Sequence, residues 1–498
     1  MTRGPVDWPT RDLLAHRVAA TPERTALVDA DRDERWTYRE LDERVGRRAA
    51  ALAEQGVDPG TVIGVLAENR VAFVELVHAA MRLRATLVPL NASLTAAELA
   101  PQVERAAVDR LLCGADTEER AADLAADLPV YSVDDPARDG VERLGRAPVP
   151  VDGGQPIDRD WTQLVLFTSG TTGDPKGVRL TAGNLVASAT ASAFRLGVRR
   201  GDRWLVCLPT YHMGGLAPVL RSALYGTAVV LQRAFDAGAT RAVVADRGVT
   251  GISLVPTMLG RLLDAGWEPP GHLRTVLLGG APASTGLIDR CAERGVPVHP
   301  TYGTTETASQ VATATPDQAF EHEGTVGQPL LFTDVTVVGD DGEPAAAGEP
   351  GELVVDGPTV TPGYIDKERT EAAFGPRGLH TGDVGYRDED GRLWVLGRAD
   401  DTIVTGGENV HPAEVADVLH EHPDVADAAV VGLDDPEWGE RVAALVVGEA
   451  DEAALESHCR ERLAPFKIPK TWGFADALPR TPSGTVDREA VRERLRDG

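Results

Sequence analysis

The first part of the chain carries two patterns of apolar residues, one typical of helices and one typical of buried strands. Thr37 and Glu40 form a capping box, and the apolar side chains that follow fall on one helical face as far as Gly56. The short run Val62–Leu66 has the composition of a buried strand. Helical and strand patterns continue to alternate over residues 71 to 135. This alternation predicts a layered α/β domain.

A second apolar run, Leu164–Phe167, leads into a loop of small and hydroxyl-bearing residues, Thr168–Gly177, which reads TSGTTGDPKG. Glycines allow several backbone N–H groups to point at one anion, hydroxyls add donors, and Lys176 adds a positive charge. The loop is not a Walker motif, because no GK[ST] follows a GxxxxG spacing and Pro175 interrupts any helix start. The pattern therefore predicts a phosphate-binding loop, with a polar surface turn as the alternative. Residues 146 to 154 are predicted to be a surface linker leading to this strand.

Turns that contain glycine follow several later strand patterns. Val276–Leu278 precedes the turn Gly279–Pro282, and the segment Pro300–Thr307 repeats this design. His212 lies within Leu208–Leu216 beside two glycines, which leave room for a ligand. These segments are candidate pocket walls, although a lone histidine is more often an ordinary polar residue.

The last third of the chain has a different organisation. Strands separated by glycine turns over residues 351 to 401 predict a small β subdomain, and residues 412 to 498 alternate between helix and strand. The predicted fold class is α/β, with a large N-terminal domain of several subdomains built from layered sheets and helices. A small, mobile α+β lid domain is expected at the C-terminus.

The charge balance is strongly acidic, since 77 Asp and Glu residues face 50 Lys and Arg residues and leave a formal net charge of −27. Only four residues are lysines: Lys176, Lys367, Lys467 and Lys470. An acidic surface almost without lysine suits a protein that works in concentrated salt, where self-repulsion is screened. The composition thus favours a halophile as the source, with an ordinary acidic bacterial protein as the alternative, and it argues against a nucleic-acid partner.

Other compositional features predict a cytoplasmic protein. No run approaches the eighteen or so apolar residues of a membrane span, and residues 1 to 12 lack an apolar signal region. The four cysteines are far apart and match no metal or disulfide spacing. We therefore expect no membrane insertion and reduced thiols, while a homo-oligomer stays possible.

The loop Thr168–Gly177 closely resembles the phosphate loop of the adenylate-forming superfamily, which comprises acyl-CoA synthetases, adenylation domains of peptide synthetases and luciferases. The strings LLGGAPA, YGTTE, HTGDVG and GRADD follow in the order that the superfamily shows. The resemblance covers almost the whole chain. It implies ATP, coenzyme A and Mg²⁺ as cofactors and a small carboxylic acid as the substrate.

The resemblance also implies roles for individual residues. In relatives the tyrosine matching Tyr302 stacks on adenine, the aspartate matching Asp383 binds the ribose, and the glutamate matching Glu306 holds magnesium. A carboxylate suits such a hard cation. The residues expected to take part in catalysis are Lys176, His212, Glu306 and Arg398. The expected nucleotide-binding residues are Thr168, Ser169, Gly170, Thr171, Thr172, Gly173, Lys176, Gly280, Ala281, Pro282, Tyr302, Gly303, Thr305, Asp383 and Arg398.

The implied reaction has two steps. ATP and the acid give an acyl-adenylate and pyrophosphate; coenzyme A then attacks the activated carbonyl and releases AMP. The family resemblance divides the chain into a domain of residues 1–397, a hinge of residues 398–401 centred on Asp400, and a lid of residues 402–498 that rotates between the steps. A lid loop is expected to shape the coenzyme A tunnel in the second step, and it consists of Gly406, Gly407, Glu408 and Asn409.

Within the superfamily, the strings around His212, Gly280, Tyr302 and Gly407 most resemble the 2-succinylbenzoate-CoA ligases of menaquinone biosynthesis. That substrate has two carboxylates, of which one is activated and the other needs hydrogen-bond donors. The candidate residues for the acid pocket are His212, Arg221, Thr257 and Ser309. Three alternatives stay open: a ligase for another aromatic or medium-chain acid, a nucleotide-binding relative without catalysis, and, less favoured because no carrier domain follows, a peptide-synthetase adenylation domain.

One position departs from the superfamily pattern. The segment Leu478–Arg488 resembles a closing motif in which a lysine follows a Ser-Gly pair and enters the active site during adenylation, but Thr485 stands there in this chain. A threonine supplies no positive charge to the transition state. Lys467, Arg480 and Arg488 are the candidate replacements.

Overall fold

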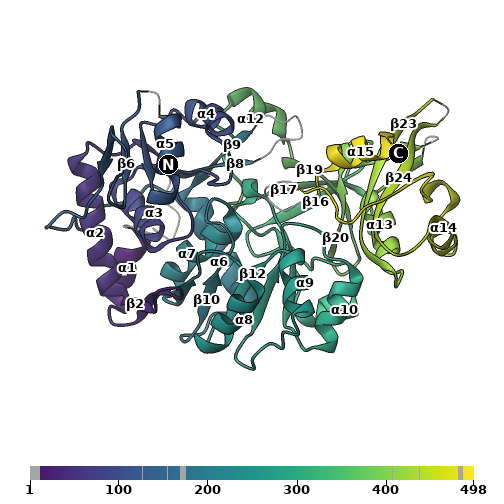
Figure 1. The fold of residues 1–498 in the computed structure, drawn as a ribbon, viewed down its shortest axis with the longest axis horizontal. Coiled ribbons are helices and arrows are strands. Elements are labelled where there is room, and N and C mark those ends of the chain that lie inside the picture. The colour runs from purple at the N-terminus through teal and green to yellow at the C-terminus, as the bar shows by residue number, and fades with distance from the viewer. Residues whose placement is uncertain are drawn as a thin grey trace.

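The computed structural model describes residues 12–125, 127–153, 155–168, 175–405, 408–436, 438–480 and 486–497. Its elements form four sheets with helices packed around them, and the C-terminal part stands to the right of the rest in Figure 1. The predicted mixed α/β architecture, with a large N-terminal part and a small C-terminal part, is confirmed.

The first sheet has seven strands in the order β7-β6-β5-β3-β4-β8-β9. Its strands run in parallel except for the last pair, which is antiparallel. The strand bounds are β3 Val62–Leu66, β4 Thr86–Pro89, β5 Arg110–Cys113, β6 Val130–Ser132, β7 Val141–Arg143, β8 Thr162–Thr168 and β9 Lys176–Thr181. The helices along this part of the chain are α1 Leu13–Ala20, α2 Tyr38–Glu54, α3 Val71–Leu83, α4 Ala96–Arg105 and α5 Glu118–Leu124.

The second sheet has eight strands in the order β15-β14-β13-β12-β10-β11-β1-β2. Its strand bounds are β1 Thr25–Asp29, β2 Glu34–Thr37, β10 Arg203–Val206, β11 Ala228–Leu231, β12 Gly251–Leu254, β13 Thr275–Leu278, β14 Val298–Tyr302 and β15 Ala312–Thr313. The accompanying helices are α6 Ala182–Leu196, α7 Met213–Tyr225, α8 Ala237–Asp246, α9 Pro256–Asp264, α10 Thr285–Glu293 and α11 Pro316–Glu321, with the 3₁₀ turn η2 at Thr305–Thr307. The largest apolar core joins α2, α3 and α7 to strands of both sheets, so these helices hold the two sheets together.

Two smaller sheets follow. The first has the order β16-β17-β19-β18, with β20 paired to β19, and it is the predicted β subdomain. Its elements are β16 Asp334–Val338, β17 Gly351–Asp356, α12 Lys367–Ala373, β18 Phe374–Gly375, β19 Gly378–Arg387 and β20 Leu393–Arg398. After the 3₁₀ turn η3, Ala399–Asp401, the C-terminal sheet is built from β21 Ile403–Thr405, β22 Glu408–Val410, β23 Val425–Asp435, β24 Gly439–Gly448 and β25 Thr471–Phe474. Its helices are α13 Pro412–His420, α14 Glu452–Arg460 and α15 Arg488–Asp497.

The local sequence explains several of these boundaries. Thr37 and Glu40 make both hydrogen bonds of the predicted capping box at the start of α2. Gly56, one residue beyond the C-cap, has φ +76°, a conformation that glycine adopts without steric cost. β3 spans the predicted residues Val62–Leu66. The four cysteines are buried and free. No helix among the described residues is long and apolar enough to cross a membrane.

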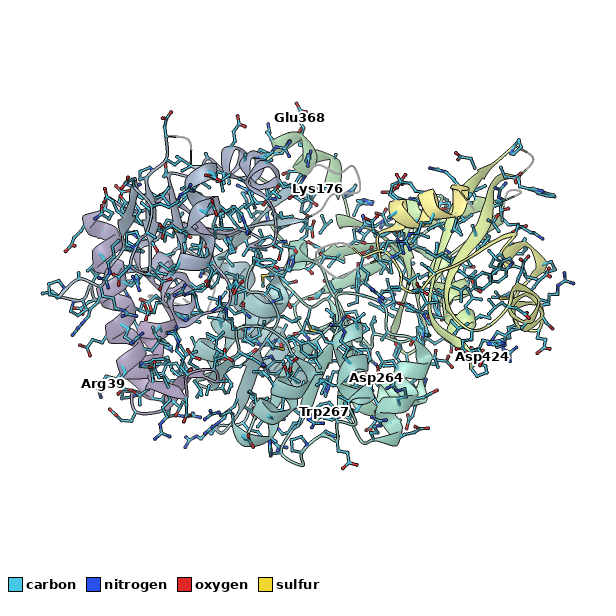
Figure 2. All side chains as sticks on the ribbon, in the orientation of Figure 1. Arg39, Lys176, Asp264, Trp267, Glu368 and Asp424 are labelled. Atoms are coloured by element: carbon cyan, nitrogen blue, oxygen red, sulfur yellow. The ribbon has the colours of Figure 1, made fainter. Side chains whose placement is uncertain are left out.

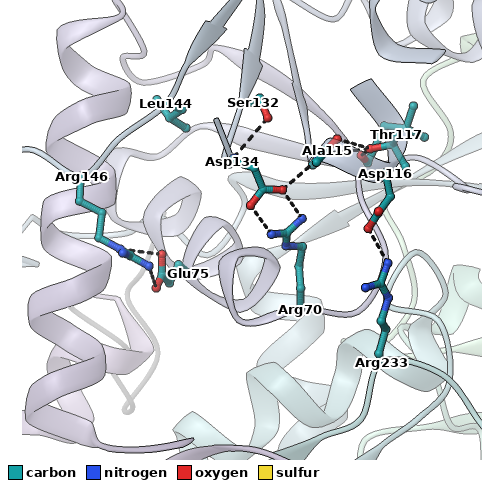
Figure 3. A network of polar contacts seen from close by, with 12 residues as sticks. Arg70, Glu75, Ala115, Asp116, Thr117, Ser132, Asp134, Leu144, Arg146 and Arg233 are labelled. Carbon is teal, nitrogen blue, oxygen red and sulfur yellow. Dashed lines mark hydrogen bonds and ion pairs between the residues drawn. The ribbon is translucent and has the colours of Figure 1, made fainter. Parts of the chain in front are cut away.

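A buried ionic network fixes the predicted linker to the first sheet. The Glu75 side chain is fully buried on α3 and accepts hydrogen bonds from Arg48 at 3.1 Å and from Arg146 at 2.7 Å. Figure 3 shows the contact between Arg146 and Glu75. Nearby, Arg70 makes a two-pronged contact with Asp134 at 2.8 and 2.6 Å. Arginine suits such bonds because its planar fork matches a carboxylate. The segment that starts at Arg146 is therefore anchored rather than loose.

Candidate nucleotide and acid site

The two ends of the predicted phosphate loop lie next to each other. β8 and β9 pair in antiparallel fashion, with Thr168 opposite Lys176. Ser169, Gly170, Thr171, Thr172 and Gly173 lie outside the described residues. A strand rather than a helix follows the lysine, which agrees with the exclusion of a Walker motif. Lys176 lies between the N-terminal layers and the C-terminal domain in Figure 2.

Three predicted nucleotide-binding side chains meet in one cluster. The Tyr302 hydroxyl donates a hydrogen bond of 2.6 Å to Asp383 Oδ2, and Arg398 Nη1 donates one of 3.1 Å to Asp383 Oδ1. Asp383 and Arg398 are opposite each other on β19 and β20. Burial raises the pKa of Asp383, although both donors act against the shift. Burial, reinforced by Asp383, also raises the pKa of Tyr302 well above its usual value. The cluster thus holds a carboxylate with two fixed donors.

The two glycine turns differ in packing, since the first is exposed and the second packs tightly against the next segment. Gly280, Ala281 and Pro282 follow β13 and are exposed, and Gly280 has φ +81°. Gly303 packs so closely on the next segment that a Cβ atom there would lie 1.6 Å from the Ser309 carbonyl oxygen. The turn after β14 therefore requires glycine. It brings the cluster of Tyr302, Asp383 and Arg398, called here the nucleotide cluster, next to Ser309.

Glu306 and Lys176 share a neighbour that the sequence did not single out as a site residue. Glu306 lies with Thr305 on η2, and its Oε1 accepts a hydrogen bond of 3.0 Å from the Tyr364 hydroxyl. Lys176 Nζ lies 5.7 Å from the centre of the Tyr364 ring. The motif Gly363-Tyr364 was the available signal, but nothing local in the sequence says which side chains it meets.

Glu306 can contribute to a magnesium site without a full set of protein ligands. No group of three or more His, Cys, Asp or Glu residues with metal-binding geometry occurs among the described residues. Mg²⁺ often takes one or two carboxylates and completes its shell with phosphates and water. A single carboxylate beside the phosphate-loop strand fits that mode.

A cleft between α6 and α7 contains Arg221. Serine side chains of α6, the apolar face of α7 and the segment Ala308–Gln310 line it. The polar lining residues are Ser188, Ser192, Arg221, Ser309 and Gln310. Ala308 and Ser309 have φ of 54° and 124°, a backbone conformation that is uncommon for residues other than glycine and that concentrates at functional sites.

Arg221 is a buried cation without a carboxylate partner among the described residues. It is 4% exposed, its guanidinium stacks 3.9 Å from the centre of the Trp204 ring, and Nη1 lies 3.5 Å from Ser192 Oγ. Nη2 is buried and has no hydrogen-bond partner in the described part of the chain. Burial lowers the pKa of Arg221 to about 10, so the group stays charged at neutral pH. A buried charge of this kind needs an anion.

The other acid-pocket candidates lie differently. His212 is the N-cap residue of α7, one position before the lining residue Met213, and burial lowers the pKa of His212. Thr257 is exposed on α9 and does not line the cleft. The structure therefore groups Arg221 and Ser309 in the cleft, with His212 at its border.

The described residues of the predicted hinge centre and lid loop lie on η3 and β22. Asp400 is in η3, Glu408 and Asn409 begin β22, and Gly406 and Gly407 lie outside the described residues. Thr485 is also outside them. Each of its candidate replacements makes an ion pair: Lys467 with Glu414, Arg480 with Asp427 and Arg488 with Asp401. The hinge at residues 398–401 stays a prediction.

Comparison with known proteins supplies the family. The model of the AMP-binding enzyme family matches residues 14–365, and that of the AMP-binding enzyme C-terminal domain matches residues 414–485. This chain belongs to the AMP-binding enzyme family. The resemblance to the adenylate-forming superfamily is thereby confirmed.

Individual relatives are similar over nearly their whole length. The 2-succinylbenzoate-CoA ligase of Bacillus pumilus is 39% identical over 485 residues, which cover 97% of both chains. The o-succinylbenzoate-CoA synthetase of Bacillus subtilis with its acyl-adenylate intermediate is 37% identical with a TM-score of 0.89, covering 97% of this chain and 98% of that one. The same synthetase with ATP and magnesium is 37% identical with a TM-score of 0.88, covering 98% and 99%.

Proposed function

We propose that this AMP-binding enzyme is a 2-succinylbenzoate-CoA ligase, which uses ATP, Mg²⁺ and coenzyme A and forms AMP and pyrophosphate. The observation that carries the proposal is the buried, carboxylate-free Arg221 in the cleft beside the nucleotide cluster. Its charge suits the substrate carboxylate that is not activated, while the apolar residues of α7 suit the aromatic ring. The relatives in which 2-succinylbenzoate is the named substrate support this choice.

Neither step of the reaction requires a covalent nucleophile from the protein. Adenylation and thioester formation rely on positioning and on charge stabilisation. We propose that Lys176 and the phosphate loop bind the triphosphate, that Glu306 holds the magnesium ion, that Asp383 binds the ribose, and that Arg398 binds the nucleotide. Because Gly303 and Ser309 touch, an acid in the cleft would lie next to the nucleotide. ATP and coenzyme A are cytoplasmic metabolites, so we place the enzyme in the cytoplasm.

Coenzyme-A-dependent formation of AMP, measured on a panel of acids, tests the proposal. The panel contains 2-succinylbenzoate, substituted benzoates and medium-chain fatty acids, and we expect 2-succinylbenzoate to give the highest kcat/KM. A higher kcat/KM for a benzoate or a fatty acid would assign the enzyme to another branch of acid-CoA ligases. Absence of AMP with every acid, together with intact ATP binding, would identify a nucleotide-binding relative without catalysis.

A further inference from the structure

The segment Thr361–Ile365 lies against the strand that carries Lys176. Arg179 N–H donates to the Gly363 carbonyl at 3.1 Å, and Ile365 N–H donates to the Gly177 carbonyl at 2.8 Å. The two segments also pack closely, because a Cβ atom at Gly177 would lie 2.7 Å from Ile365 Cδ1. The segment therefore follows β9 directly after the phosphate loop.

The same segment is also bonded to the turn that carries Glu306. Thr361 N–H donates to the Glu306 carbonyl at 2.7 Å, and the Tyr364 hydroxyl donates to Glu306 Oε1 at 3.0 Å. Glu306 is thus held through both its backbone and its side chain. Among the described residues, Oε2 accepts no hydrogen bond, so one carboxylate oxygen is fixed and the other is left for a ligand.

Backbone contacts with α12 fix the position of Tyr364, and its side chain lies between the Lys176 strand and the Glu306 turn. Its backbone N–H donates to Thr370 Oγ1 at 2.9 Å at the start of α12, and the preceding Gly363 has φ +129° against Thr370. A residue with a side chain at Gly363 would clash with Thr370, since its Cβ would lie 2.3 Å from Thr370 Cγ2. Tyr364 is 7% exposed, and its ring faces the Lys176 ammonium at 5.7 Å, within the range of a cation–π contact.

We propose that Tyr364 is a positioning residue. It orients the Glu306 carboxylate toward the magnesium ion of the ATP complex and fixes the place of that carboxylate relative to the Lys176 ammonium. A phenol that donates to one carboxylate oxygen fixes the rotation of the carboxylate, so the second oxygen faces the cation without prior reorganisation. This proposal rests on the proposed function, because it assigns the ion to the adenylation step.

The substitution Tyr364→Phe tests it, since the ring stays and only the hydroxyl is lost. We measure acid-dependent ATP–pyrophosphate exchange and, separately, the rise in melting temperature that ATP causes, both at stepped concentrations of MgCl₂. The half-saturating magnesium concentration should rise about 10-fold in both measurements, as expected for a hydrogen bond to a charged group. Exchange should recover at high magnesium, and the KM of the acid should not change.

Tyr131→Phe is the matched control. Tyr131 lies on β6 of the first sheet and is also 7% exposed, and its hydroxyl donates a hydrogen bond to Gln55 at the C-cap of α2. This variant should keep the wild-type magnesium response. Combining Tyr364→Phe with Glu306→Gln should abolish the effect of the first substitution, because the bonded carboxylate is gone.

Two results would overturn the proposal. One is an unchanged half-saturating magnesium concentration in Tyr364→Phe with a lower rate at all concentrations, which indicates a structural role only. The other is a magnesium shift of the same size in the Glu306→Gln background. If the wild type catalyses no exchange with any acid, the proposed function fails, and the melting measurement still decides the role of Tyr364.

Discussion

The Tyr302 hydroxyl donates a hydrogen bond of 2.6 Å to Asp383 Oδ2, although 81 positions separate the two residues in the chain. With Arg398 on the other oxygen, the carboxylate is oriented before any nucleotide binds. Such preorganisation lowers the cost of ordering on binding.

Tyr302→Phe removes one of these two donors. We expect ATP to bind roughly 10-fold more weakly, since hydrogen bonds to charged groups contribute about 1.5–3 kcal/mol. The pKa of Asp383, already raised by burial, should rise further because the Tyr302 donor is lost. On acidification, the variant should therefore lose activity at a higher pH than the wild type. The measurement is the KM of ATP against pH. A variant with an unchanged KM for ATP and an altered KM for the acid contradicts the assignment.

His78 should make the fold sensitive to acid. It is 1% exposed on α3, and burial, with a smaller effect of Arg82, lowers its pKa to about 4. In the unfolded chain, the imidazole of His78 becomes protonated near pH 6.5, whereas in the folded protein it stays neutral down to about pH 4. The contribution of His78 to the free energy of unfolding is therefore complete above pH 6.5 and is lost as the pH falls toward 4. The loss is roughly 3 kcal/mol at 1.36 kcal/mol per pKa unit.

Urea unfolding of wild type and His78→Gln between pH 7 and pH 4 checks this. The variant should be less stable at pH 7 and should lose less stability on acidification. Equal slopes against pH in both proteins would show that His78 is not the cause.

Local sequence patterns predicted the elements well, for a physical reason. The capping box at Thr37 and the apolar run of β3 are decided by neighbours within a few residues, so the sequence contains the whole cause. The contact between Tyr364 and Glu306 joins residues 58 positions apart and depends on how β9 and η2 pack. Likewise, only the tertiary structure shows that Arg221 is buried and Thr257 exposed. Family resemblance supplied the candidate residues, and the contacts between them required the fold.

Salt should stabilise the protein. With a formal net charge of −27, repulsion between carboxylates opposes the compact state and is screened by ions. The melting temperature should therefore rise as potassium chloride is increased toward molar concentration. A steady fall of the melting temperature over that range contradicts the halophile interpretation.

Thr485→Lys should speed adenylation alone. Arg488, one of the three candidate replacements, has Arg398 in its environment: burial first, and then the charges of Arg492 and Arg398, lower its pKa. An arginine committed to Asp401 is an imperfect substitute for a free ammonium. We expect at least about a 10-fold faster ATP-dependent formation of the adenylate. The reaction of preformed adenylate with coenzyme A should stay unchanged, and an equal effect on both half-reactions would refute the two-conformation account.

The most direct test of the central claim compares the diacid with two acids that each lack one carboxylate. For wild type and Arg221→Met, which keeps an apolar side chain beside Trp204, we would measure kcat/KM for 2-succinylbenzoate, 4-oxo-4-phenylbutanoate and 2-butanoylbenzoate. Wild type should prefer the diacid by about 100-fold or more, because a site built around a buried donor rejects a substrate that leaves it unpaired. Arg221→Met should remove most of that preference and change the values for the monoacids little. Two results would contradict the proposal that Arg221 recognises the second carboxylate of 2-succinylbenzoate. One is a wild-type kcat/KM that is the same for the monoacids as for the diacid. The other is an equal loss of kcat/KM for all three acids in Arg221→Met.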